Sequence, residues 1–80
     1  MKRFWLSDMA IDVAGARGLL DHAAAGACVS FEGWVRNHND GRVVHRLDYQ
    51  AYVPRAEAEG GRILDEAIAR FNVREAHCIH

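Results

Sequence analysis

The segment Gly26-Ala-Cys-Val-Ser-Phe-Glu-Gly-Trp-Val-Arg-Asn-His-Asn-Asp-Gly-Arg42 decides the fold that we expect for this chain of 80 residues. Its first part alternates in the way of a strand with one apolar face. The apolar face carries Ala27, Val29, Phe31, Gly33 and Val35, and the other face carries Cys28, Ser30, Glu32, Trp34 and Arg36. A strand of about ten residues is long enough to anchor a sheet.

A polar segment from Arg36 to Arg42 follows this strand and brings donors and acceptors together. Asp40-Gly41 is a hairpin signal, because glycine supplies the positive φ angle that a tight connection needs. Two interpretations stay open at this point. The segment is either a solvated hairpin loop or an anion-binding edge around Arg36, whose planar guanidinium suits a carboxylate or a phosphate.

Length and composition favour a single domain, residues 1–80, of an ordinary globular type. Ten basic and eleven acidic residues give a net charge of −1, so we expect no nucleic-acid partner. No apolar run approaches the ~20 residues of a membrane span and no secretory leader is visible, so we expect a cytoplasmic protein without a membrane partner. Cys28 and Cys78 are too far apart in sequence for a disulfide framework, and we expect both thiols to be reduced and buried.

The remaining periodicities predict an α+β chain. In chain order we expect a strand at 2–6, a helix at 12–25, strands at 26–36 and 43–53, a helix at 55–71 and a strand at 73–80. This order is that of the ferredoxin-like β-α-β-β-α-β sandwich, an antiparallel sheet with two helices on one face. Gly60 and Gly61 lie inside the second helix at a cost of about 1 kcal/mol each relative to alanine, for which a close helix–sheet contact is our interpretation.

Several residues of types that often bind metals or ligands can be explained here by packing alone. His77, Cys78 and His80 resemble metal ligands, but on a strand His77 faces away from the other two, so we expect no metal site. Trp34 lies on the same face as Arg36 and is either the floor of a pocket for a flat ring or a packing residue. Nothing in the chain indicates a bound cofactor.

Several motifs resemble the large, catalytic subunit of molybdopterin synthase. Val29–Asn39 is similar to that family's Val-x-Phe-x-Gly-x-Val-Arg-x-x-Asn segment, and Leu47–Tyr52 to its Leu-x-Tyr-Glu-x-Tyr strand. The helix around Ile63–Ala67 and the strand ending at Ile79-His80 match its following helix and its Ile-His-Arg strand in order and spacing. The resemblance covers nearly all of the chain from Gly26 onward, and the first helix loosely.

The resemblance implies a sulfurtransferase of molybdenum cofactor biosynthesis. In that family, sulfur passes from the thiocarboxylated C-terminus of a small ubiquitin-like subunit to cyclic pyranopterin monophosphate, which yields molybdopterin. By position, Trp34, Val35 and Arg36 correspond to a substrate-contacting segment, and His38 and Asn39 would line the same region. Arg36 is the implied catalytic residue, as an anchor for the phosphate or for a developing oxyanion.

The resemblance also implies partners and a longer chain. Large subunits of this family form a homodimer with small subunits at its two ends, which makes a heterotetramer. The family's essential lysines and its second His-Arg motif belong to a portion beyond His80, and Lys2 is the only lysine here. Because the last predicted strand also runs to the terminus, we expect a truncated chain, the N-terminal part of such a subunit, which alone catalyses nothing.

Two other readings compete with this one. Gly33–Asn37 followed by Asp40-Gly41 resembles a stretch of the acylphosphatases, which share the same fold class. Acylphosphatases also need a glycine-rich anion loop near the N-terminus, and residues 2–24 contain no such loop. The third reading is a non-catalytic ferredoxin-like module that binds another protein through its sheet edge or its helices.

Overall fold

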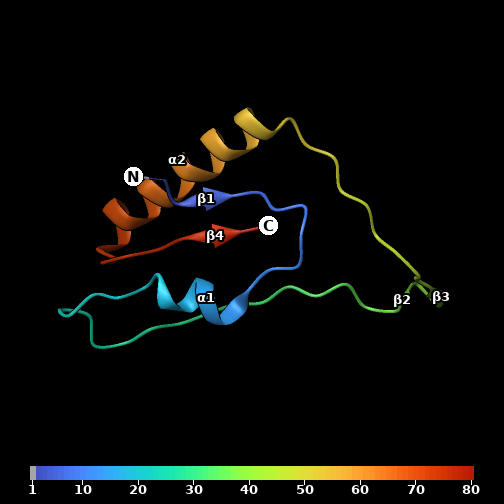
Figure 1. The fold of residues 1–80 in the computed structure, drawn as a ribbon, viewed down its shortest axis with the longest axis horizontal. Coiled ribbons are helices and arrows are strands. Elements are labelled where there is room, and N and C mark those ends of the chain that lie inside the picture. Colours follow the sequence, from blue (N-terminus) through green and yellow to red (C-terminus); the bar gives the residue numbers. More distant parts are fainter. Residues whose placement is uncertain (1) are drawn as a thin grey trace.

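The computed structural model describes residues 2–80 and shows an α+β chain. Its elements in chain order are β1 (Phe4–Trp5), α1 (Val13–Gly18), β2 (His38–Asn39), β3 (Arg42–Val43), α2 (Val53–Phe71) and β4 (Cys78–Ile79). β1 pairs with β4 in parallel, and β2 pairs with β3 in a separate antiparallel ladder. Figure 1 shows α2 along the β1–β4 pair and the β2–β3 hairpin at the far end of the chain's long axis.

The long helix α2 confirms the helix expected at 55–71 and begins two residues earlier, at Val53. Pro54 lies in the first turn, where its missing N–H costs no helical hydrogen bond. At the other end Asn72 adopts the left-handed conformation with φ 55°, and the N–H groups of Asn72 and Val73 both donate to the carbonyl of Ile68. Such an ending satisfies carbonyl groups that the last turn leaves free.

β1 packs against α2 through a glycine. A Cβ atom placed on Gly60 would overlap the ring of Phe4, whereas one placed on Gly61 would meet nothing within 4 Å. The close helix–strand contact that we expected at this pair therefore holds for Gly60. The structure gives no reason for Gly61.

Ion pairs also hold the N-terminal strand along α2. Lys2 Nζ lies 3.0 Å from Glu57 Oε1, and the second oxygen of Glu57 accepts the backbone N–H of Leu6 at 3.0 Å. Arg3 donates to Asp65 at 2.8 Å and to Glu75 at 2.9 Å. The Leu6 N–H first, and Lys2 second, lower the pKa of Glu57. The N-terminal segment around β1 thus stabilises the charged form of Glu57, and Glu57 in turn holds this segment along α2.

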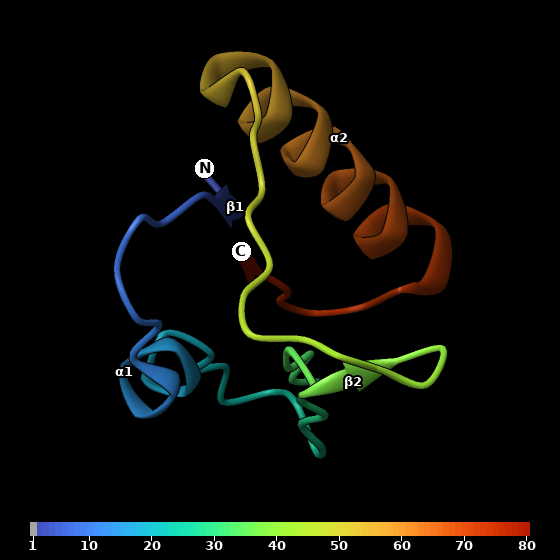
Figure 2. The same ribbon diagram turned by 90° about the vertical axis from the view of Figure 1, so that its right-hand side faces the viewer.

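The single ferredoxin-like sheet is not confirmed. Residues 26–36 contain no strand, and of the strand expected at 43–53 only Val43 lies in a ladder. The β1–β4 pair is parallel where an antiparallel sheet was expected. α1 lies on the opposite side of this pair from α2, so the two helices do not share a face (Figures 1 and 2).

The expected strands are missing or short because a strand forms only when it pairs with another strand, and that partner lies far away in the sequence. A two-stranded hairpin has little stability of its own, so its strands remain short when no third strand covers them. The expected helix 12–25 is reduced to α1, six residues with Asp12 as the predicted N-cap, whose side chain accepts the N–H of Gly15 at 3.0 Å. Short helices are marginal alone, and Gly15 and Gly18 weaken this one further.

Among the described residues no side chain is fully buried. The apolar face expected for the central strand is in solvent, with Val29 89% and Phe31 92% exposed. The radius of gyration is 15.1 Å, whereas a compact chain of this length has about 12 Å. The chain therefore presents an extended apolar surface beside its α2–β1–β4 unit.

Candidate functional site

A tight turn defines the hairpin that carries the predicted anion-binding residues. Asp40 and Gly41 have φ angles of 52° and 74°, as in the two-residue turns that match the twist of paired strands. The ladder pairs His38 with Val43 and Asn39 with Arg42, and the N–H of Val44 donates to the carbonyl of Asn37 at 2.7 Å. The hairpin predicted from Asp40-Gly41 is confirmed.

Arg36 is exposed and is held by a neutral neighbour. Its Nη2 donates to Oδ1 of Asn39 at 2.6 Å, and Nδ2 of Asn39 lies 3.4 Å from Oδ2 of Asp40. Within residues 2–80 no carboxylate lies within ion-pair distance of Arg36. Because a guanidinium has five N–H donors, the contact with Asn39 leaves most of them for another acceptor.

The other three predicted residues make local contacts or none. The indole N–H of Trp34 lies 3.4 Å from Oε1 of Glu32, and Trp34 is 84% exposed. Val35 is 56% exposed. The ring of His38 contacts the side chain of Asn37 at 2.9 Å. These residues thus remain accessible to a ligand.

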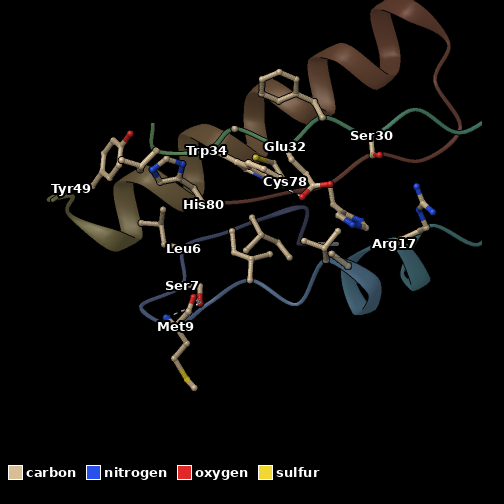
Figure 3. Close-up of a pocket in the computed structure, with 18 of the residues that line it drawn as sticks. Leu6, Ser7, Met9, Arg17, Ser30, Glu32, Trp34, Tyr49, Cys78 and His80 are labelled. Carbon is tan, nitrogen blue, oxygen red and sulfur yellow. Dashed lines mark hydrogen bonds between the residues drawn. The ribbon is translucent and has the colours of Figure 1, made fainter. Parts of the chain in front are cut away.

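A wide, open cavity lies between the segment 28–35 and the β4 end of the chain (Figure 3). Trp34 and Val35 line it, together with Tyr49, Cys78 and His80. The three hairpin residues of the predicted site do not line it. The structure therefore divides the predicted site into a cavity part and a hairpin part, and only Arg36, His38 and Asn39 share the hairpin region.

The histidines near the C-terminus pack against aromatic rings. His77 meets Trp5 edge-on with 5.9 Å between ring centres, and His80 meets Tyr49 edge-on at 4.7 Å. In the described part of the chain no three His, Cys, Asp or Glu side chains form a group that could hold a metal ion. Cys28 and Cys78 are free and exposed, so the expectation that they are buried is wrong.

Sequence reasoning gave no role to Arg42 and none to Tyr49. The position of Arg42 could have been predicted, because a two-residue turn at Asp40-Gly41 places Arg42 opposite Asn39. No local pattern predicted the contact between Tyr49 and His80, which are 31 positions apart in sequence.

Comparison with known proteins assigns the family. Residues 6–80 match the family model described as MoaE protein. The chain belongs to the MoaE protein family. The molybdopterin synthase catalytic subunit of Thermoplasma volcanium is 45% identical to this MoaE-family chain over 56 residues, which are 70% of the chain and 41% of that protein. The protein of the same name from Pyrococcus abyssi is 38% identical over 69 residues, 86% of the chain and 47% of that protein.

These matches confirm the family resemblance and favour it over the acylphosphatase reading. The MoaE-family chain spans less than half the length of either relative. No solved structure matches it. Within residues 2–80 no helix has the length and apolar character required to cross a membrane.

Proposed function

We propose that this MoaE-family chain provides the Arg36 segment of a cytoplasmic molybdopterin synthase catalytic subunit. The reaction is the transfer of sulfur from the thiocarboxylated C-terminus of a small ubiquitin-like subunit to cyclic pyranopterin monophosphate. Family membership over residues 6–80 and the similarity to two molybdopterin synthase catalytic subunits support the proposal. Both relatives are more than twice as long as their matched segments. Catalysis in this proposal therefore needs further residues beside those of this chain.

The main support for the proposal is the exposure of the Arg36 guanidinium and its lack of an acidic partner. This guanidinium is exposed, bonded to Asn39 and free of carboxylates within residues 2–80. A cation in this state can pair with a phosphate or with an oxyanion that forms during sulfur transfer. Arg36 accordingly anchors the substrate phosphate, or the developing oxyanion, in the proposed reaction.

The other predicted residues have supporting roles in this proposal. Trp34 and Val35 line the open cavity and offer apolar contacts to the pterin ring system. His38 and Asn39 flank Arg36 on the hairpin. Lys2, the only lysine, is paired with Glu57 at 3.0 Å and lies in the N-terminal segment. No amine is therefore placed beside Arg36, and we expect the 80-residue chain alone to be inactive.

A partner surface is part of the same proposal. The chain exposes 7248 Å², whereas a compact monomer of 9.0 kDa exposes about 4,900 Å². The excess of roughly 2,400 Å² per chain is of the size that obligate dimers bury. Both relatives are more than twice as long as their matched segments, so the further residues of a complete subunit can cover part of this surface. The rest is available to the partners that we propose, a second large subunit and the small carrier subunit.

A chimera tests the proposed function. The 56 residues that match the Thermoplasma volcanium relative replace their counterpart in that protein. The product is supplied with a thiocarboxylated carrier subunit and cyclic pyranopterin monophosphate. We expect molybdopterin to form in the chimera and not with the 80-residue chain alone. A folded chimera without activity would contradict the proposed function, and activity of the 80-residue chain would contradict its dependence on further residues.

A further inference from the structure

The hairpin places a second arginine, Arg42, on the same face as Asn39, the residue that holds Arg36. Arg42 lies directly opposite Asn39 in the β2–β3 ladder. Residues directly opposite in an antiparallel pair have their side chains on one face, with Cβ atoms about 5 Å apart. Asn39 in turn holds Arg36 through the 2.6 Å bond from Nη2. The side chain of Asn39 therefore lies beside the Cβ of Arg42 and is bonded to the guanidinium of Arg36.

The charges around this face favour an anion. Neither Arg36 nor Arg42 has a carboxylate within ion-pair distance in residues 2–80. Asp40, the acidic residue of the turn, lies 3.4 Å from the amide nitrogen of Asn39. The next arginine along the chain differs, because Arg46 Nε is bonded to both oxygens of Asp48 at 2.8 and 2.9 Å. The hairpin tip therefore has two cations with free donors, and the following arginine is neutralised.

We propose that Arg42 and Arg36 together bind one phosphate group, with Asn39 as the residue that positions Arg36. The inference rests on the proposed role of Arg36 as a phosphate anchor and extends it to Arg42, which lies outside the segment Val29–Asn39. The ligand class is a phosphate monoester or inorganic phosphate. Planar guanidinium groups bind phosphate oxygens through two parallel N–H bonds, which makes two of them a suitable pair for one such group.

The rigidity of the turn explains why Asn39 has a positioning role. Asp40 and Gly41 both have positive φ angles, which define the two-residue connection and the register of Asn39 with Arg42. The Oδ1 atom of Asn39 accepts a hydrogen bond from Nη2 of Arg36 and so orients this guanidinium before an anion binds. A guanidinium that is already oriented loses less side-chain freedom when the anion binds.

The experiment titrates the 80-residue chain with inorganic phosphate and records the Nε–Hε signals of its arginines by NMR. We expect Arg42→Ala to weaken phosphate binding about fivefold, as for the loss of one exposed ion pair, and Arg36→Ala to weaken it at least as much. Arg46→Ala removes the same charge from an arginine that is already paired, and we expect a change below about twofold. Equal effects of Arg42→Ala and Arg46→Ala, or no effect of Arg42→Ala, would overturn the proposal.

A second readout isolates the role of Asn39. We expect Asn39→Ala to shift and sharpen the Arg36 Nε–Hε signal before any phosphate is added, because the guanidinium then rotates freely. Asn39→Asp keeps an oxygen acceptor and is expected to restore the restrained signal, while Asn37→Ala leaves it unchanged. An Arg36 signal that does not respond to Asn39→Ala would remove the positioning role. Since phosphate binding needs no sulfur donor, these results stand apart from the chimera assay.

Discussion

Gly60 and Gly61 are neighbours in α2 but have different surroundings. A Cβ on Gly60 would overlap the ring of Phe4, and a Cβ on Gly61 would meet open space. We expect Gly60→Ala to destabilise the chain by about 1–2 kcal/mol, because overpacking outweighs the gain in helix propensity. We expect Gly61→Ala to stabilise it by up to about 1 kcal/mol.

Urea unfolding followed by far-UV circular dichroism measures both changes in the free energy of unfolding. Combining Gly60→Ala with Phe4→Ala removes the overlapping ring and is expected to cancel much of the loss, which identifies the contact. If both alanine variants were equally stabilised, Phe4 would not pack on Gly60.

Arg36 is the residue on which the proposed chemistry depends. We expect Arg36→Ala in the chimera to lower turnover more than tenfold with the helical content unchanged, because the side chain is exposed and bonded only to Asn39. Arg36→Lys keeps the charge but not the planar pair of donors, so it should restore only part of the activity. Arg55→Ala, at an exposed position of α2, is the matched control. Unchanged kinetics of Arg36→Ala would exclude Arg36 from the site.

At the scale of elements, the attachment of β1 to α2 depends on pH. The Leu6 N–H and Lys2 lower the pKa of Glu57 below its ordinary 4.5 in the folded chain. A carboxylate with a lowered folded pKa contributes stability above its unfolded pKa, and this contribution is lost as the pH falls through the folded value. We therefore expect the attachment of β1 to weaken below about pH 4.5.

Hydrogen exchange of the Leu6 amide is the local measurement, because this N–H donates to Glu57. Its protection should decrease on acidification and should be low at every pH in Glu57→Ala, which has no acceptor for this N–H. The control is Glu59→Ala, since Glu59 pairs with Arg62 on the same helix. A Leu6 amide equally protected in Glu57→Ala would show that the carboxylate does not hold the strand.

The elements that sequence predicted well are those with local causes. α2 follows from its apolar periodicity, Pro54 and Asn72, and the hairpin follows from Asp40-Gly41. The long strands expected at 26–36 and 43–53 did not form over most of their length, because a strand is stable only when another strand and a covering layer are present. An alternating sequence predicts which face of a strand would be buried, but it does not identify the strand that would pair with it.

The same distinction applies to the candidate site. The residues of the site could be named from the motif, since Val35, Arg36 and Asn39 occupy its fixed positions and Trp34 and His38 lie between them. Their division between the cavity and the hairpin could not be predicted, because it depends on how residues 26–36 pack. The position of Arg42 follows from turn geometry, so a more careful use of register could have found it.

At the scale of the whole molecule, the exposed apolar surface should drive association. Val29 and Phe31 are about nine-tenths exposed, and the chain shows roughly 2,400 Å² more surface than a compact monomer. We expect the purified chain to form dimers at micromolar concentration, as measured by sedimentation velocity, and its unfolding midpoint to rise with concentration.

A matched pair of variants locates the associating surface. Phe31→Ser should weaken self-association more than tenfold, whereas Met9→Ser, at another exposed apolar position, should change it little. A chain that stays monomeric at ~100 µM would contradict self-association through residues 26–36.

The parallel pairing of β1 with β4 decides where the chain can be tagged. The carbonyl of His80 accepts the N–H of Ser7 at 2.8 Å, and both residues line the open cavity. Any residues joined after His80, including a fluorophore or an affinity handle, would therefore start from the lining of the cavity. The N-terminal segment, in which Lys2 pairs with Glu57 of α2, does not line the cavity at Lys2, so immobilised binding assays should be oriented from that end.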